Sequence, residues 1–342
     1  MSRFGGAHRR PRQTVAEAEA AEVSEGKGPQ GLSDLADFNG PDDGRPQPEC
    51  HVEVAHYTAR NWGGRHENED RWMAESAIYS PRRLPFHMIG VMDGHDTESA
   101  SDTVARMLPG VLARHLNEGK AVGEAYTLAM EELEDALKKV HATAGTCVVS
   151  CTIAGRFVWC ANLGDCRAVL VPLVVNKTEK LAPKVLSVCW LSRDHKASAP
   201  EERKRIMQAG GMVTDGRVEG LEPSRTLGDF DVKMHVKKGV ISIVPEVRRY
   251  ELGDGSGPAH AILVCATDGV WDVMTGQDVC DLVQARKELG RLQAGIGGGP
   301  GGPAPDCQPL RDLAEDLVQF SIAKGSRDDC TAVVALLSVG GP

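Results

Sequence analysis

The sequence predicts a layered domain of the α/β or α+β class, because short apolar strands alternate with amphipathic helices. The apolar runs are rich in Val, Ile, Phe or Trp and are bounded by turn residues, as is typical of strands with one or both faces buried. They lie at 86–92, 157–163, 261–267 and 331–339. A chain of 342 residues is long enough to bury a large core.

Two segments between the strands have apolar residues spaced for one face of a helix. In 103–116 the apolar positions follow the 3.6-residue period, although Pro109 and Gly110 in the middle predict a kink or a break. A second amphipathic helix is predicted over 128–140. Such helices bury their apolar stripe against another element, which is why we expect layers.

A third helix is predicted from its end signals. Ser198 and Glu201 have the spacing of a capping box, and Pro200 falls in the first turn. The helix is expected to continue through 203–209 and to end at Gly210, which a second glycine follows.

The charge balance excludes several functional classes. Lys and Arg number 39 against 48 Asp and Glu, so the net charge is −9 and a nucleic-acid-coating role, which needs a basic face, is disfavoured. No stretch approaches the ~20 apolar residues of a membrane span, and no apolar secretory segment or myristoylation site begins the chain. We expect a monomer in the cytoplasm, and in the nucleus as well, with no membrane partner.

The chain divides into a tail and one domain. Residues 1–50 form a predicted disordered tail with a basic tip and an acidic remainder, because this composition buries too little apolar surface to offset the entropy of ordering. Residues 51–340 form a single predicted catalytic domain. Within it, the Gly- and Pro-rich stretch 290–309 is expected to be a flexible insert.

Acidic residues recur where the apolar strands meet loops. They are Glu69, Asp70, Asp93, Asp165, Asp268, Asp272, Asp328 and Asp329. One Asp-Gly is an ordinary turn, but several carboxylates at neighbouring strand ends would repel one another unless cations neutralise them. Mg²⁺ or Mn²⁺, which prefer oxygen ligands, are the expected cofactors, and the scarcity of nearby His argues against zinc.

Such a site suits phosphoryl transfer to water. Two cations ~3.5–4 Å apart can hold a bridging hydroxide for in-line attack on a phosphoryl group, with no covalent intermediate. Arg65 could grip the phosphoryl oxygens, and His95, next to Asp93, could protonate the departing oxygen. Taken singly, either residue would more often be an ordinary surface arginine or a hydrogen-bonded histidine.

Eight motifs in order resemble those of the metal-dependent serine/threonine protein phosphatases of type 2C. They are RHENED at 65–70, VMDGH at 91–95, NLGDCR at 162–167, SRDHK at 192–196, the segment 201–211, SRTLGDF at 224–230, TDGVWD at 267–272 and SRDD at 326–329. The resemblance covers about residues 52–338. It implies an α+β fold, a β-sandwich of two mainly antiparallel sheets flanked by helix pairs in four αββα layers.

The resemblance also implies a role for each site residue. Asp93 bridges the two metal ions, Asp268 and Asp328 bind the first, and Glu69 and the carbonyl of Gly94 serve the second. The residues that match the remaining roles are Asp165 and Asp272 for a weaker third ion, Arg65 for phosphate and His95 as general acid. The segment 212–226 matches a flap beside the substrate groove, and phosphorylated proteins are the implied substrates.

Three residues depart from the family's usual pattern. Asp96 stands where Gly is usual, so the loop loses glycine's conformational freedom and gains a charge near the second metal. Asp329 stands where Asn is common, and Met92 replaces a larger residue. None removes a ligand, so we expect an active phosphoserine and phosphothreonine hydrolase.

Other functions are open to the sequence. A catalytically silent pseudophosphatase that scaffolds phosphoproteins is the main alternative, and a phosphatase of small metabolites would share the same site. Cys280 and Arg286 fit the C-x₅-R spacing of cysteine phosphatases, but the segment between them lacks Gly and has helical periodicity, so we interpret the match as chance. No P-loop motif occurs, so no nucleotide site is predicted.

Overall fold

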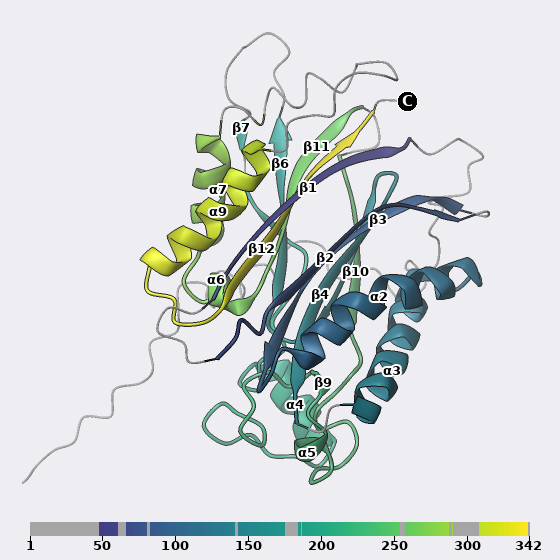
Figure 1. Cartoon of the computed structure of the whole chain (residues 1–342), viewed down its shortest axis with the longest axis vertical. Coiled ribbons are helices and arrows are strands. Elements are labelled where there is room, and N and C mark those ends of the chain that lie inside the picture. Colours follow the sequence, from purple (N-terminus) through teal and green to yellow (C-terminus); the bar gives the residue numbers. More distant parts are fainter. Residues whose placement is uncertain are drawn as a thin grey trace, which may run out of the picture.

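Two antiparallel sheets stacked face to face form the centre of the protein, and helices cover the outer face of each (Figure 1). This computed structural model describes residues 48–60, 66–80, 83–140, 143–174, 184–185, 187–253, 257–286, 289 and 308–340. The four layers confirm the predicted αββα sandwich. The predicted tail lies outside these residues up to position 47, as does most of the predicted insert.

The first sheet has the order β1-β12-β11-β6-β7, with β8 paired to β6. Its strands are β1 (Cys50–Ala59), β6 (Arg167–Val174), β7 (Lys184–Val185), β8 (Cys189–Trp190), β11 (Ala259–Ala266) and β12 (Cys330–Val339). The central strand β12 pairs along its length with β1, from Cys50 opposite Val339 to Ala59 opposite Cys330. Every residue of β12 is buried, as the continuous apolar run predicts.

The second sheet has the order β10-β5-β4-β3-β2, with β9 paired to β4. Its strands are β2 (Arg71–Ser80), β3 (Arg83–His95), β4 (Gly145–Ala154), β5 (Phe157–Leu163), β9 (Leu227–Gly228) and β10 (Glu246–Glu251). The predicted strand 86–92 is too short, because β3 continues to His95. Asp93 pairs with Cys147 and His95 with Gly145, so the ladder to β4 overrides the turn preference of Asp-Gly.

Two pairs of long helices form the outer layers. The helices are α2 (Ser99–Asn117), α3 (Val122–Val140), α4 (Pro200–Gln208), α5 (Phe230–Lys233), α6 (Asp268–Trp271), α7 (Gly276–Ala285) and α9 (Gln308–Ala323). Helix α2 is continuous through Pro109, so the predicted break is wrong. The helix continues because Leu108 and Leu112 are fully buried against the sheet, which offsets the one backbone hydrogen bond that proline removes.

The ends of the short helices differ in part from the predictions. Helix α4 begins at Pro200 after Ala199, and no side chain caps it, so the predicted capping box is wrong. Gly210, with φ +86°, ends the helix as predicted. Residues 308 and 309 were predicted to belong to the insert, but they begin α9. Pro309 fits there because the N–H groups of the first turn have no acceptor within the helix, so the missing N–H of proline costs nothing.

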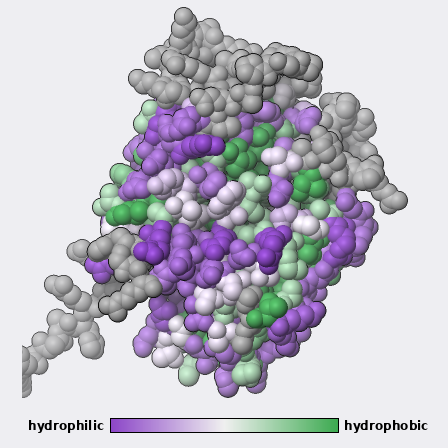
Figure 2. All heavy atoms as spheres, in the orientation of Figure 1, coloured by the Kyte–Doolittle hydropathy of each residue, from purple (hydrophilic) through white to green (hydrophobic). Residues whose placement is uncertain are grey.

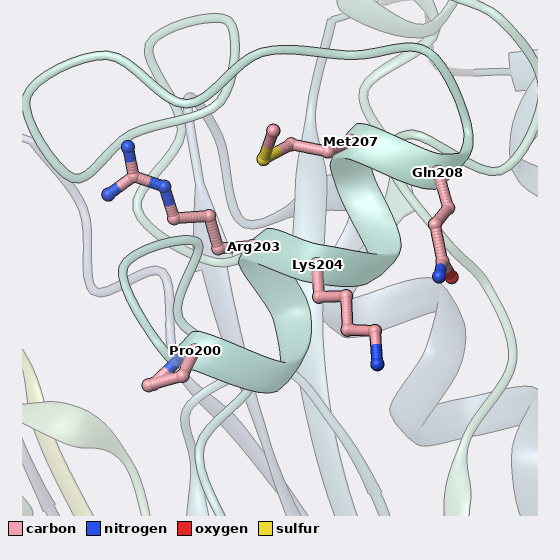
Figure 3. A pocket seen from close by; sticks show the side chains of 5 residues that line it. All are labelled: Pro200, Arg203, Lys204, Met207 and Gln208. Carbon is pink, nitrogen blue, oxygen red and sulfur yellow. The ribbon is translucent and has the colours of Figure 1, made fainter.

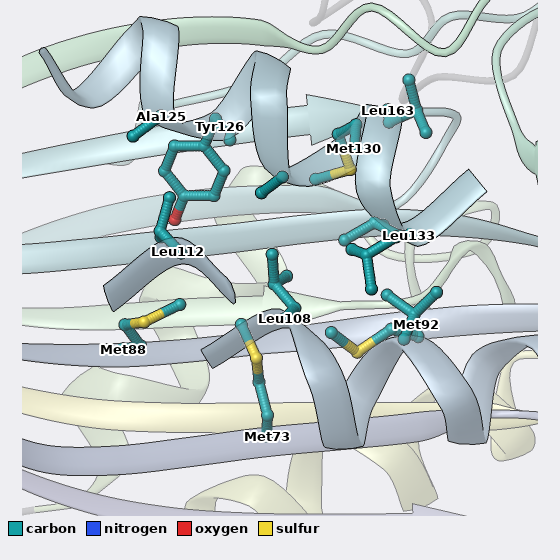
Figure 4. Close-up of a cluster of buried hydrophobic side chains, with 14 of the residues drawn as sticks. Met73, Met88, Met92, Leu108, Leu112, Ala125, Tyr126, Met130, Leu133 and Leu163 are labelled. Atoms are coloured by element: carbon teal, nitrogen blue, oxygen red, sulfur yellow. The ribbon is translucent and has the colours of Figure 1, made fainter. Parts of the chain in front are cut away.

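Apolar side chains fill each interface between layers. Under α2 and α3, Tyr126, Leu112 and Met130 pack on the second sheet (Figure 4). The opposite outer layer packs on the first sheet through α7 and α9, and a third cluster lies between the sheets. Among the described residues, no helix is both long and apolar enough to cross a membrane. On the face drawn in Figure 2, apolar residues form small, separate patches among hydrophilic ones.

A smaller unit, which we call the flap, is formed by residues 197–241. It contains α4 and α5 and packs around a small apolar cluster that includes Ile206, Val218 and Val240. In Figure 1 it lies at the lower end of the sandwich. The predicted flap segment 212–226 lies within it.

Candidate metal centre and active site

Strand ends from both sheets place Asp268 and Asp328, two of the predicted metal ligands, within electrostatic range of a third, Asp93. Asp93 lies at the end of β3 in the second sheet. Asp268 begins α6 directly after β11, and Asp328 lies just before β12, both in the first sheet. The charges of Asp268 and Asp328 both act on Asp93, so these carboxylates share one electrostatic environment. The stacking of the two sheets therefore gathers acids that are up to 235 residues apart in the chain.

Burial and mutual repulsion destabilise the charged forms of the central carboxylates. Burial raises the pKa of Asp93 well above its usual value, and the charges of Asp268, Asp70, Asp165 and Asp328 raise it further. Burial and its acidic neighbours likewise raise the pKa of Asp268, although the charge of Lys196 opposes this shift. Carboxylates that repel one another in a desolvated site favour the binding of a cation.

The donor set fits a hard divalent cation. All of the predicted ligands offer oxygen, the donor that Mg²⁺ and Mn²⁺ prefer. Within the described ranges, no group of three or more His, Cys, Asp or Glu side chains lies close enough together to hold a metal ion. The fit therefore rests on the chemistry of the donors and on the acidic charge that converges on Asp93.

The backbone of Glu69 is fixed from two sides. Its N–H donates to Asp329 Oδ2 at 2.8 Å, and its carbonyl accepts from Ser101 Oγ at 2.5 Å. A Cβ on Gly94 would lie 2.5 Å from the Glu69 carbonyl oxygen and 2.7 Å from Ser101 Oγ, so only glycine allows this approach. Asp329, which departs from the usual Asn, thus still accepts a hydrogen bond that positions Glu69.

Asp96 adopts the backbone conformation that glycine would favour. Its φ is +72°, and its Oδ2 accepts a hydrogen bond from Thr143 Oγ1 at 2.5 Å. The pKa of Glu69 is raised by burial first, and the charge of Asp96 is among the further causes. The expected extra negative charge is therefore present beside Glu69, the predicted ligand of a second metal.

The two residues predicted for a weaker third ion differ in their surroundings. Asp165 follows β5, is 2% exposed and accepts a hydrogen bond from Cys147 Sγ at 3.2 Å. Burial raises the pKa of Asp165 to about 6, although the charge of Lys196 opposes this shift. Asp272, directly after α6, is exposed and accepts a hydrogen bond from Lys196 Nζ at 3.1 Å.

A histidine–aspartate pair lies beside the acid cluster. His95 Nε2 is 2.6 Å from Asp229 Oδ1, and Thr226 Oγ1 donates to the other oxygen of the same carboxylate. Burial lowers the pKa of His95, but the hydrogen bond and charge of Asp229 outweigh it and raise the pKa overall. No role was assigned to Asp229 from the sequence, although it lies in the motif at 224–230. Asp229 lies 134 residues from His95 in the chain, so no local sequence pattern indicates their contact.

The sequence predicts Asp70 as one of the acids at the strand ends but assigns it no role of its own. Asp70 is 5% exposed, accepts a hydrogen bond from Thr267 Oγ1 at 2.9 Å and acts electrostatically on Asp93. Burial raises the pKa of Asp70 to about 7. Its position next to Glu69 in the motif at 65–70 is the sequence signal that could have indicated a role in the site.

Two other residues considered from the sequence are not part of this cluster. Arg65, the predicted phosphate ligand, lies outside the described residues. Cys280 lies inside α7, and Arg286 after that helix bonds to Asp316 and Asp312 of α9. A helix cannot form the phosphate-binding loop of a cysteine phosphatase, so the interpretation as a chance match is confirmed.

The flap is held at its base by a buried carboxylate. Glu202 on α4 is 5% exposed and accepts hydrogen bonds from Ser224 Oγ at 2.6 Å, from Arg205 Nε at 2.8 Å and from Arg225 Nε at 3.1 Å. The outer face of the same helix carries a surface hollow (Figure 3). It is lined by Pro200, Arg203, Lys204, Met207 and Gln208, none of which is a predicted site residue.

Comparison with known proteins explains this arrangement. The family model described as protein phosphatase 2C matches residues 55–330, which is most of the chain. The chain belongs to the protein phosphatase 2C family. The predicted family resemblance is thereby confirmed.

Relatives within the phosphatase 2C family come from animals and plants. The chain is 30% identical to the probable protein phosphatase 1N of Homo sapiens over 72% of its own length and 53% of that protein. It is 27% identical to the probable protein phosphatase 2C 8 of Arabidopsis thaliana over 81% of its length and 76% of that protein. The bovine protein phosphatase 1B is 31% identical, but the match spans only 34% of it. The chain thus spans between a third and just over half of these mammalian relatives.

Solved structures share the fold. A serine-threonine phosphatase 2C from Toxoplasma gondii superposes with a TM-score of 0.58 at 22% identity, over 86% of this chain and 98% of that one. A C. elegans sex determining protein superposes with a TM-score of 0.62 at 21% identity, over 83% and 64% of the two chains. The phosphatase 2C sandwich is therefore the fold of this chain.

Proposed function

We propose that this chain is a metal-dependent phosphatase that hydrolyses phosphoserine and phosphothreonine in proteins. The main support is the convergence of acidic charge on Asp93, beside a histidine that is bonded to a buried aspartate. Membership of the phosphatase 2C family supports the same activity. A cytoplasmic and nuclear location and a monomeric state remain predictions.

The proposed metal ligands are four acidic side chains and one backbone carbonyl, and repulsion between neighbouring acids acts on the carboxylates. Asp93, Asp268, Asp328, Glu69 and the carbonyl of Gly94 would hold two Mn²⁺ or Mg²⁺ ions. When bound, such ions supply an activated water and offset the negative charge of a phosphoryl group. Glu69 is held in place by Asp329 and Ser101, which is the positioning that a ligand on a loop requires.

The proposed general acid is His95. The hydrogen bond and charge of Asp229 raise its pKa and so favour the protonated form, and the same bond orients the ring. A protonated imidazole can deliver a proton to the departing serine or threonine oxygen, which is a poor leaving group without one. Asp229 acts through His95 and is a positioning residue.

Phosphate release from a phosphothreonine peptide tests the proposal. We expect release that requires Mn²⁺ or Mg²⁺, stops on chelation and is abolished by Asp93→Asn. Cys280→Ser, a change inside α7, serves as the control and should retain activity. Binding of phosphopeptide without turnover in saturating metal would instead favour the pseudophosphatase alternative. If small phosphorylated metabolites outcompeted the phosphothreonine peptide as substrates, the result would favour a phosphatase of small metabolites.

A further inference from the structure

The side chain of Lys196 lies at the base of the flap, within electrostatic range of the predicted metal ligand Asp268. Its Nζ donates to Asp272 Oδ1 at 3.1 Å and to Glu222 Oε1 at 3.0 Å, and the residue is 8% exposed. Its backbone is fixed on both sides, by a bridge to Pro223 and by the Ala199 N–H, which donates to its carbonyl at 2.9 Å. The ammonium therefore has a defined position beside Asp272.

Other cations already satisfy two of the four carboxylates that surround this ammonium. Asp272, Asp165, Glu222 and Asp194 all act electrostatically on Lys196. Arg167 Nη2 donates to Asp194 Oδ2 at 2.7 Å, and Arg217 Nη2 donates to Glu222 Oε2 at 3.0 Å. Lys196 therefore shares its charge between its two hydrogen-bonded partners, Glu222 and Asp272, and acts on Asp165 within electrostatic range.

Asp165 and Asp272 are the same pair that the family resemblance assigns to a weaker third ion. A divalent cation between them would lie close to the ammonium, and the two positive charges would repel each other in a site of low dielectric. Asp272 is half exposed, so ions from solution can reach it and compete with Lys196. A metal ion at this pair would therefore have to displace the ammonium from Asp272.

We propose that the ammonium of Lys196 is a built-in cation that occupies the third-ion position between Asp165 and Asp272, so that this centre binds two metal ions and not three. The inference rests on the proposed function in one respect, since it assumes a metal centre at Asp93. It further predicts that removing Lys196 opens a third metal site.

Direct measurement of Mn²⁺ binding tests the inference. The full chain is stripped with chelator and titrated with Mn²⁺, and the free ion is followed by its electron paramagnetic resonance signal. We expect two bound ions in the wild type, three in Lys196→Met, and two again when Asp272→Asn is added to that variant. Lys204→Met, on the exposed face of α4, is the matched control and should bind two. Lys196→Arg, which keeps the charge, should also bind two.

Asp272→Asn in the wild type is a second test, which does not depend on the folding of Lys196→Met. Asp272→Asn alone should leave the stoichiometry at two, because no ion binds at that position. Three ions in the wild type, with one lost in Asp272→Asn, would overturn the inference, as would two ions in a folded Lys196→Met. These outcomes are separate from the proposed function, which fails if two Mn²⁺ bind and no phosphate is released.

Discussion

Replacing Glu202 by Gln should loosen the flap without unfolding the sandwich. The carboxylate of Glu202 holds Ser224, Arg205 and Arg225 together at the base of the flap. Gln has the same shape but lacks the charge, so it weakens these bonds without creating a cavity. The sandwich has its own core clusters, which contain none of these residues.

The size of the effect follows from the pKa of Glu202. Although burial raises it, hydrogen bonds from Arg225 and Ser224 and the nearby arginine charges lower it from 4.5 to about 2. A shift of this size, discounted for solvent screening, corresponds to about 2 kcal/mol. The two arginines keep backbone acceptors, so the total cost should be about 2–3 kcal/mol, below the ~3–5 kcal/mol of breaking a fully buried pair.

Native-state hydrogen exchange measures this local stability. The amides of Ala197, Ser224 and Ser242, which bond within the flap region, should exchange roughly 30- to 150-fold faster in Glu202→Gln, since ~1.4 kcal/mol is a factor of ten. Amides of β12 should keep their protection. Glu201→Gln, one residue away but on an exposed side chain, is the matched control and should change little.

The pH dependence gives a second test of the same reasoning. Because the folded pKa of Glu202 is lowered, its stabilising effect is complete above about 4.5 and is lost as the pH falls from there toward 2. Wild-type flap amides should therefore lose protection over this range, and Glu202→Gln should lack that component. Unchanged flap exchange in Glu202→Gln, or an equal effect from Glu201→Gln, would refute the reasoning.

Three further predictions concern the metal centre. Asp93→Asn should abolish turnover but leave the thermal midpoint in chelator equal or higher, because a repelled, buried carboxylate is removed; a large drop in the midpoint would contradict this. Asp229→Asn should slow hydrolysis of a phosphothreonine peptide on the order of 100-fold. Hydrolysis of p-nitrophenyl phosphate, whose leaving group needs no proton, should slow by under ~10-fold. Equal losses on both substrates would count against the role of His95. Asp96→Gly should lower the Mn²⁺ concentration for half-maximal rate, because it removes a charge that acts on Glu69 and ~1 kcal/mol of backbone strain; an unchanged value would disprove it.

Local patterns in the sequence were sufficient to predict several of the strands and helices and the family. The apolar run 157–163 coincides with β5, and 331–339 differs from β12 by one residue, because continuous apolar runs bounded by turns are characteristic of buried strands. The ordered motifs indicated the phosphatase 2C fold. The predictions failed where packing overrides local preference, as at Pro109 in α2 and at Ser198 before α4.

The sequence therefore predicts most of the candidate site residues, but not the side chains that they contact. That Asp93 and Asp268 belong to one site could be inferred from motif order, whereas the bonds of His95 to Asp229 and of Lys196 to Asp272 were not predicted. A motif records which side chains are present over a few residues, and turn and strand signals act over the same short range. Contacts across 76 or 134 residues are set by which strands pair and how the two sheets stack, so only the tertiary structure decides them.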